Sequence, residues 1–209
     1  MTKCFIYTGF NKNSTLPDFT WYRASALQDR AGSGLMVGAM SRVFLGLASG
    51  LLLVLAAAAG LGLMVRGDDL FVQHFALGLF AALLAALVHV VTFTYFAVTG
   101  KAIRQAVALA HLDDSILQRT QTYKKWALRC VVLGFFPVVA TVALGAAVWN
   151  HREFSHYHLA VALTAIVANV VALAGQYRLI CRNQELLATA MERYRNEGPA
   201  PSTARAQTP

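Results

Sequence analysis

The segment from Phe71 to Arg104 constrains this chain most, because it contains no Asp, Glu, Lys or Arg before Lys101. A helix rises about 1.5 Å per residue and the hydrocarbon core of a bilayer is about 30 Å thick, so this run is long enough to span a membrane. With three similar apolar runs, the predicted spans are residues 43–65, 73–99, 126–149 and 158–180. The sequence therefore predicts an all-α integral membrane four-helix bundle made of two transmembrane hairpins.

The composition supports a lipid environment. Of the 209 residues, 57% are hydrophobic and 13% are charged, whereas soluble domains carry about 25% charged residues. A single soluble core of this size cannot bury so much apolar surface, and lipid is the natural solvent for the excess. The net charge of +8 comes from basic residues that flank the apolar runs. We therefore expect the lipid bilayer as a partner and no nucleic acid.

The basic residues also predict an orientation. Of 18 Lys and Arg residues, only Arg66 and Arg152 fall in the loops 66–72 and 150–157 within the two hairpins. The positive-inside rule then predicts a multi-pass protein of the cell (inner) membrane with both termini in the cytoplasm. Its three cysteines lie on or near that reducing side, so no disulfide is expected. They are Cys4, Cys130 and Cys181.

Residues 1–41 differ from the rest, since they are polar and have no hydrophobic period. Two interpretations are open: a flexible cytoplasmic N-terminal arm, or a segment upstream of the true start at Met36 or Met40. Residues 42–197 are predicted to form the transmembrane domain. Residues 198–209 contain no large apolar side chain, which predicts a disordered tail.

Helical patterns continue beyond the predicted spans, through residues 101–125 and after residue 180. They predict cytoplasmic helical extensions. The run Asp113-Asp114-Ser115 is typical of a turn followed by a helix N-cap.

Small and polar residues recur at helical spacing on the second, third and fourth spans, which predicts faces that contact other helices rather than lipid. On this basis Gly78→Leu and Ala165→Leu are expected to destabilise the bundle more than Leu79→Ala. The simpler interpretation is packing with a few interhelical hydrogen bonds. The functional alternative is a proton relay, a ligand contact, or a metal or haem ligand. The buried polar candidates are His89, Thr92, Asn169 and Gln176, and the third span offers Gly134, Thr141 and Gly145.

Four histidines lie near the predicted outer side, and three of them suggest a metal site: His151, His156 and His158. His156 and His158 form a His-x-His pair, which can chelate a transition metal if the backbone is extended. The sequence contains no His-Glu-x-x-His motif.

His74 and His158 suggest a second arrangement, in which the two residues bind haem b. Each ends an outer loop of equal length and begins an inward-running helix, a weak repeat between the hairpins. In an up-and-down bundle these two helices are diagonal and run the same way, so both histidines are expected at one depth, as two axial ligands require.

No sequence motif predicts catalysis. There is no Gly-x-Ser-x-Gly, P-loop or dinucleotide-binding fingerprint, and no span interior contains Asp or Glu. We therefore expect a protein that acts without catalysis or cofactor, as an accessory, assembly or interaction subunit with other membrane subunits or its own copies. The alternatives are a haem b or quinone-linked electron-transfer subunit, and a metal-handling protein that uses the outer histidines.

Overall fold

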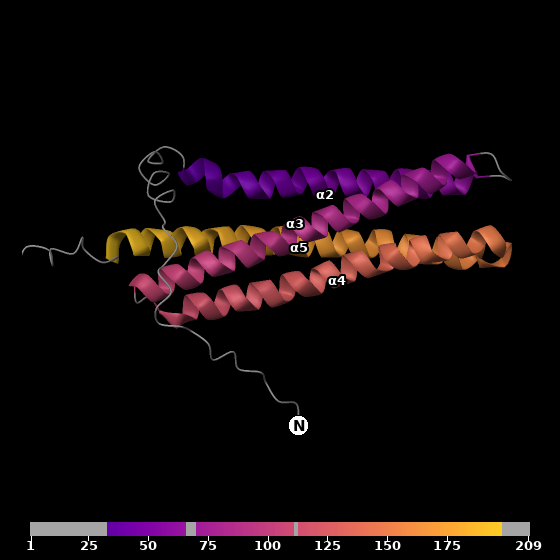
Figure 1. The fold of residues 1–209 in the computed structure, drawn as a ribbon. Helices are drawn as coiled ribbons and strands as arrows, with labels where there is room; N and C mark the ends of the chain where they lie inside the picture. Colours follow the sequence, from indigo (N-terminus) through magenta and orange to yellow (C-terminus); the bar gives the residue numbers. More distant parts are fainter. Residues whose placement is uncertain (1–32, 66–69, 111–112, 198–209) are drawn as a thin grey trace, which may run out of the picture. The chain divides into compact units, whose positions relative to one another are not determined.

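The computed structural model describes residues 33–65, 70–110 and 113–197, and all of its long elements are helices (Figure 1). In order they are α2 (Ser33–Met64), α3 (Phe71–Ala110), α4 (Asp114–Asn150), the short 3-10 helix η1 (Arg152–Phe154) and α5 (Ser155–Glu197). The predicted all-α four-helix fold is confirmed. The chain divides into residues 1–36 and 37–209, and the packing described below is that of the second unit.

The predicted N-terminal arm and C-terminal tail lie mostly outside the described residues. Within the arm, helix α2 begins at Ser33, ahead of both Met36 and Met40.

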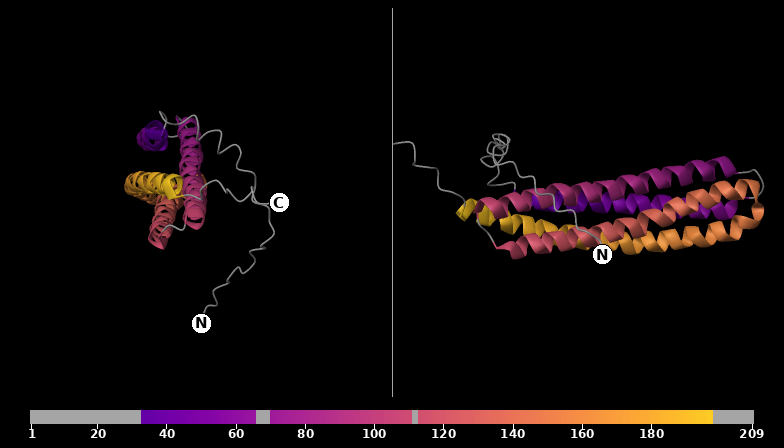
Figure 2. Two further views of the ribbon diagram at one scale, coloured as in Figure 1. Left: turned by 90° about the vertical axis from the view of Figure 1, so that its left-hand side faces the viewer. Right: turned by 60° about the horizontal axis from the view of Figure 1, so that its bottom comes forward.

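Consecutive helices run in opposite directions, as two hairpins require (Figure 1). The α2–α3 and α4–α5 connections lie at one end, here called the loop end, and the α3–α4 turn lies at the opposite end. In the end-on view of Figure 2, α3 lies beside α4 and α5. Helices α3 and α5 are in direct contact rather than separated across a diagonal, since Asn183 of α5 donates a hydrogen bond to Thr99 of α3 at 2.9 Å.

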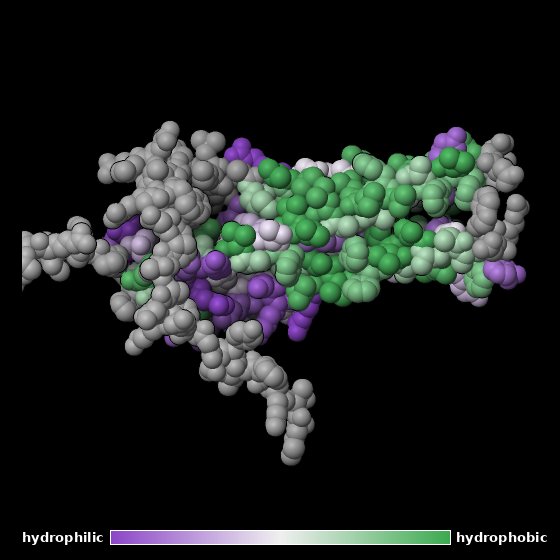
Figure 3. Space-filling model, viewed as in Figure 1, coloured by the Kyte–Doolittle hydropathy of each residue, from purple (hydrophilic) through white to green (hydrophobic). Residues whose placement is uncertain are grey.

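Many large apolar side chains face outward, which indicates what surrounds the helices. Leu53 and Val72 are each 71% exposed and Leu83 is 63% exposed. Figure 3 shows apolar side chains covering the middle of the helices, with hydrophilic residues gathered toward the ends. The buried positions are instead rich in alanine and polar residues. A surface more apolar than its core suits lipid and not water.

Four helices are long and apolar enough to cross a membrane. The chain therefore has the architecture of a multi-pass membrane protein.

The main core draws on all four helices. Phe44 and Leu51 from α2 join Phe96 from α3, Val138 from α4 and Ile180 from α5 in one cluster of buried residues. Five of the 13 buried members of this cluster are alanines, which let the helices approach closely at those positions. In lipid, such packing contacts rather than water exclusion hold the helices together.

A second core lies beyond the predicted spans, at the end opposite the loop end. Ile103 of α3 and Ala190 of α5 are fully buried there, and Ile116 of α4 is 6% exposed. Helix α5 continues to Glu197, about 25 Å past the predicted end of its span at residue 180. The predicted helical extensions are thus present as a packed layer of α3, α4 and α5.

One packing prediction needs correction at Gly78. A Cβ added to Gly78 would have no atom within 4 Å, so this residue borders open space rather than a helix contact. Ala165, in contrast, is 2% exposed and belongs to the core. Helical spacing identified the correct face of α3, but it cannot reveal whether the neighbouring helix touches that face at a given depth.

Helix α4 begins with the predicted N-cap. Asp113 accepts hydrogen bonds from the Ser115 backbone N–H at 3.0 Å and from the Ser115 hydroxyl at 2.7 Å. These bonds favour the ionised carboxylate, and they lower the pKa of Asp113 below its usual value.

We expect the first turn of α4 to lose this stabilisation in acid. The Asp113 pKa is lower in the folded state, so the stabilisation is complete above the unfolded-state pKa and is lost as pH falls through the folded-state value. Amide NMR shifts of Ser115 and Ile116, followed from neutral to acid pH, should report this titration. Asp113→Asn keeps a capping side chain and removes the charge. Its Ser115 shift should therefore not titrate, and a titration identical to that of the native chain would contradict the assignment.

Candidate functional site

His89 lies deep in the bundle, between three helices. The residue is 2% exposed, and its Nδ1 lies 3.0 Å from Nε2 of Gln176 on α5. Gln176 is fully buried and accepts a hydrogen bond from the Thr92 hydroxyl at 3.4 Å, while Thr92 also donates to the Val88 carbonyl at 3.0 Å. Three of the predicted polar candidates are therefore brought together.

Gly134 of α4 makes room for the His89 ring. A Cβ at this glycine would lie 2.6 Å from His89 Nε2 and 2.7 Å from Cε1, distances that no real Cβ tolerates. The Phe135 ring meets the imidazole edge-on, with 6.5 Å between centroids. The absence of a side chain at Gly134 thus sets how closely α4 approaches α3 here.

Asn169, the fourth candidate, ties α5 to the same glycine. Its amide nitrogen donates to the Gly134 carbonyl and to the Ala165 carbonyl, each at 2.9 Å. Within the described ranges, however, neither His89 Nε2 nor Asn169 Oδ1 makes a hydrogen bond. The two atoms are complementary, since a ring that accepts at Nδ1 and is neutral carries its proton on Nε2.

A second polar layer lies further along the same two helices. Asn183 of α5 donates to the Thr99 hydroxyl at 2.9 Å and to the Tyr95 hydroxyl at 3.3 Å. The buried amides Asn169, Gln176 and Asn183 recur every seven residues on α5. A seven-residue spacing keeps side chains facing one neighbouring helix in a left-handed pair. Gln176 and Asn183 therefore fix the register of α5 against α3, while Asn169 ties α5 to α4.

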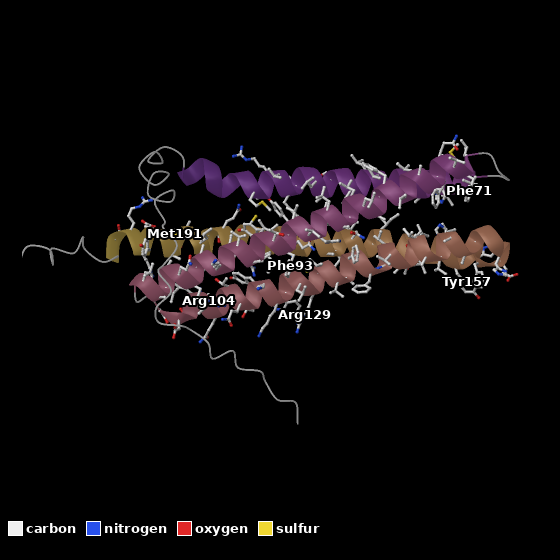
Figure 4. The ribbon with its side chains drawn as sticks, viewed as in Figure 1. Phe71, Phe93, Arg104, Arg129, Tyr157 and Met191 are labelled. Atoms are coloured by element: carbon white, nitrogen blue, oxygen red, sulfur yellow. The ribbon has the colours of Figure 1, made fainter. Side chains whose placement is uncertain are left out.

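His74 and His158 meet at the loop end of the bundle. Their ring centroids are 6.1 Å apart and their planes are 86° from parallel. Figure 4 marks this end with Phe71 of α3 and Tyr157 of α5, while Arg104 and Met191 lie at the opposite end. The structure thus brings the two residues together at one depth.

Each of these histidines is anchored within its own hairpin. His74 Nδ1 lies 3.1 Å from the Ala58 carbonyl of α2, and His158 Nδ1 lies 3.1 Å from the Thr141 carbonyl of α4. A carbonyl oxygen can only accept, so Nδ1 carries the proton in both rings and the Nε2 lone pairs are bare when the rings are neutral.

A glycine supports each ring, one turn beyond the acceptor carbonyl. A Cβ at Gly62 would lie 2.7 Å from His74 Cε1, and a Cβ at Gly145 would lie 3.0 Å from His158 Cε1. The weak repeat between the hairpins therefore extends to the contacts of both rings. Gly62 was not identified from the sequence, although it stands 12 residues ahead of His74, close to the 13 residues between Gly145 and His158.

The outer histidines proposed as a metal site are not gathered. His156 lies in helix α5, so it lacks the extended backbone that a His-x-His chelate needs. Nδ1 of His151 lies 3.6 Å from Oε1 of Glu153, and both side chains are exposed. No group of three potential His, Cys, Asp or Glu ligands occurs among the residues whose positions are described.

Comparisons with known protein families, curated proteins and solved structures find no match. The geometry of the described residues must therefore carry any functional conclusion.

Proposed function

We propose that this chain is a small multi-pass subunit of the cell (inner) membrane, with both termini in the cytoplasm, that acts without catalysis by docking a partner protein. The distribution of basic residues supports the orientation, because only Arg66 and Arg152 of 18 basic residues lie in the loops at the loop end. The docking end is then the packed helical extension around Ile103 and Ala190.

An open groove between α3 and α4 carries this proposal. It has a volume of about 300 Å³ and includes the side chains of Lys101, Arg104 and Lys124, with no acidic residue in its lining. All three cations are exposed. A groove lined by cations favours an acidic partner, because complementary charge speeds encounter and excludes wrong partners. We therefore expect the partner to present carboxylates to this groove.

Charge reversal in the groove tests the proposal. Lys101→Glu with Lys124→Glu should release the partner, so that the chain, extracted from native membranes in mild detergent, migrates as a smaller species. Arg119→Glu with Lys125→Glu is the matched control, since it changes the charge equally at exposed positions outside the groove lining. The control should keep the larger species.

Two results would contradict the proposal. One is equal behaviour of the two double variants. The other is a C-terminal reporter that is active only on the outer side of the membrane, since the groove and the end of α5 would then face away from the cytoplasm.

A further inference from the structure

We propose that His74 and His158 are the two axial ligands of a b-type haem bound between the α2–α3 and α4–α5 hairpins. This inference is independent of the docking function, because it concerns the opposite end of the bundle. It rests on the placement of both rings, on the protonation of their nitrogens and on the space beside them.

The spacing of the rings suits two ligands of one metal. Imidazole nitrogens bind transition metals at about 2 Å, so two axial nitrogens on one metal lie about 4 Å apart. The ring centroids are farther apart than the nitrogens, because each centroid lies one ring radius behind its nitrogen. The centroids of His74 and His158 are 6.1 Å apart. Each ring belongs to a different hairpin, so a bound group would join the two halves of the protein.

Both rings make the kind of hydrogen bond that metal-binding histidines usually make. Metal-binding histidines commonly donate their second N–H to a carbonyl, which fixes the tautomer and raises the basicity of the ligating nitrogen. Both Nδ1 atoms do so here, at 3.1 Å, to Ala58 and Thr141. Neither Nε2 has a hydrogen-bond partner among the described residues. The pair therefore presents two lone pairs with no other evident use.

The small number of protein ligands favours haem over a bare ion. Zinc or copper sites usually take three or four protein ligands, and no third His, Cys, Asp or Glu joins this pair in the part of the chain that the structure describes. Haem iron brings four nitrogens of its own and needs only two axial ligands. With both axial positions filled by His74 and His158, the iron would have no open site for oxygen, which favours electron transfer.

Open space lies on the same face of α3 as His74. Gly78 is one turn further along the helix, and a Cβ there would meet no atom within 4 Å. Both imidazoles are only partly buried. Gly78 therefore leaves room for one edge of a flat apolar macrocycle beside the His74 ring.

The test is the visible spectrum of the purified full chain, made with a haem precursor supplied and also reconstituted with haemin. We expect a Soret band with equimolar haem for the native chain, and its loss in His74→Ala and in His158→Ala. His156→Ala is the matched control, since His156 is exposed and outside the pair. It should retain the band.

A second pair of variants keeps the proposal testable if the histidine variants do not fold. Gly62→Ala would press a Cβ against His74 Cε1, whereas Gly60→Ala on the same helix would meet no atom within 4 Å. Gly62→Ala should lower haem affinity about 10–100-fold, the effect typical of changes that reorient a metal ligand. Gly60→Ala should bind as the native chain does.

Electron paramagnetic resonance gives a readout that an incidental haem would not reproduce. The 86° angle between the ring planes makes each imidazole donate to a different iron π orbital, so those orbitals stay nearly equal in energy. The ferric protein should then give a highly anisotropic low-spin signal. A colourless native chain under both conditions, a band that survives both histidine variants, equal affinity of Gly62→Ala and Gly60→Ala, or a high-spin signal would overturn the proposal.

Discussion

Gly134→Ala is expected to destabilise the bundle by about 1–3 kcal/mol, the usual cost of overpacking a core. The added methyl would lie 2.6 Å from His89 Nε2 and 3.2 Å from the Ala172 Cβ, and neither neighbour can retreat easily because both side chains are buried. The same substitution at Gly46 would meet no atom within 4 Å. There it should be neutral or stabilise the helix by about 0.5–1 kcal/mol, since alanine is the better helix former.

The His89→Ala background sharpens this prediction. Removing the imidazole creates the space that the Gly134→Ala methyl needs, so most of the cost of the second change should disappear in the double variant. Unfolding free energies of the four proteins, measured in detergent, form a double-mutant cycle with an expected coupling of about 0.5–3 kcal/mol, the range found for residues in contact. Additive effects would show that α4 does not approach α3 at these two residues.

Gln176→Leu is expected to have the second large effect, about 1–3 kcal/mol of unfolding free energy. Leucine nearly preserves the volume, so the loss is mainly that of the hydrogen bond to His89 Nδ1, which is left buried without a partner. Asn183→Leu should cost less. Its partner Thr99 keeps a hydrogen bond to the Tyr95 carbonyl at 2.8 Å, and its other partner, the Tyr95 hydroxyl, is only partly buried.

The double variant His89→Leu with Gln176→Leu separates polar pairing from packing. Replacing both partners of a buried hydrogen bond by apolar groups of similar size can be nearly neutral. The double variant should therefore be more stable than Gln176→Leu alone, as measured by unfolding in the same detergent. If it is less stable, the loss in Gln176→Leu comes from packing and not from the stranded nitrogen of His89.

The polar cluster around His89 and the pair of His74 and His158 differ in how their polar atoms are used. The Thr92, Gln176, His89 and Asn169 contacts join α3, α4 and α5. They leave His89 Nε2 and Asn169 Oδ1 without a hydrogen bond among the described residues. The His74 and His158 rings are anchored by backbone carbonyls and leave both Nε2 atoms unused. The two unused atoms of the first arrangement are a donor and an acceptor, which are complementary. The Nε2 atoms of His74 and His158 are both acceptors, so they cannot bond to each other.

The sequence by itself determined the four helices and the main polar side chains that they bury. Long runs without charge must form helices in lipid, because no water is present to satisfy an open backbone. Small and polar residues at helical spacing then mark the inner faces, and this rule alone is enough to identify His89, Thr92, Asn169 and Gln176 as buried. The N-cap at Asp113 was also predictable, because capping depends on neighbours two or three residues away.

Only the tertiary structure decided which of those side chains meet. Whether an added Cβ clashes, as at Gly134 and Gly62, or meets open space, as at Gly78, depends on the rotation and depth of a neighbouring helix to within about 1 Å. Hydrophobic spacing gives the face of a helix but neither of these quantities. The same limit applies to the Nδ1 contacts of His74 and His158, whose acceptors are backbone carbonyls. Every residue has such a carbonyl, so no residue type in the sequence marks the two that bind.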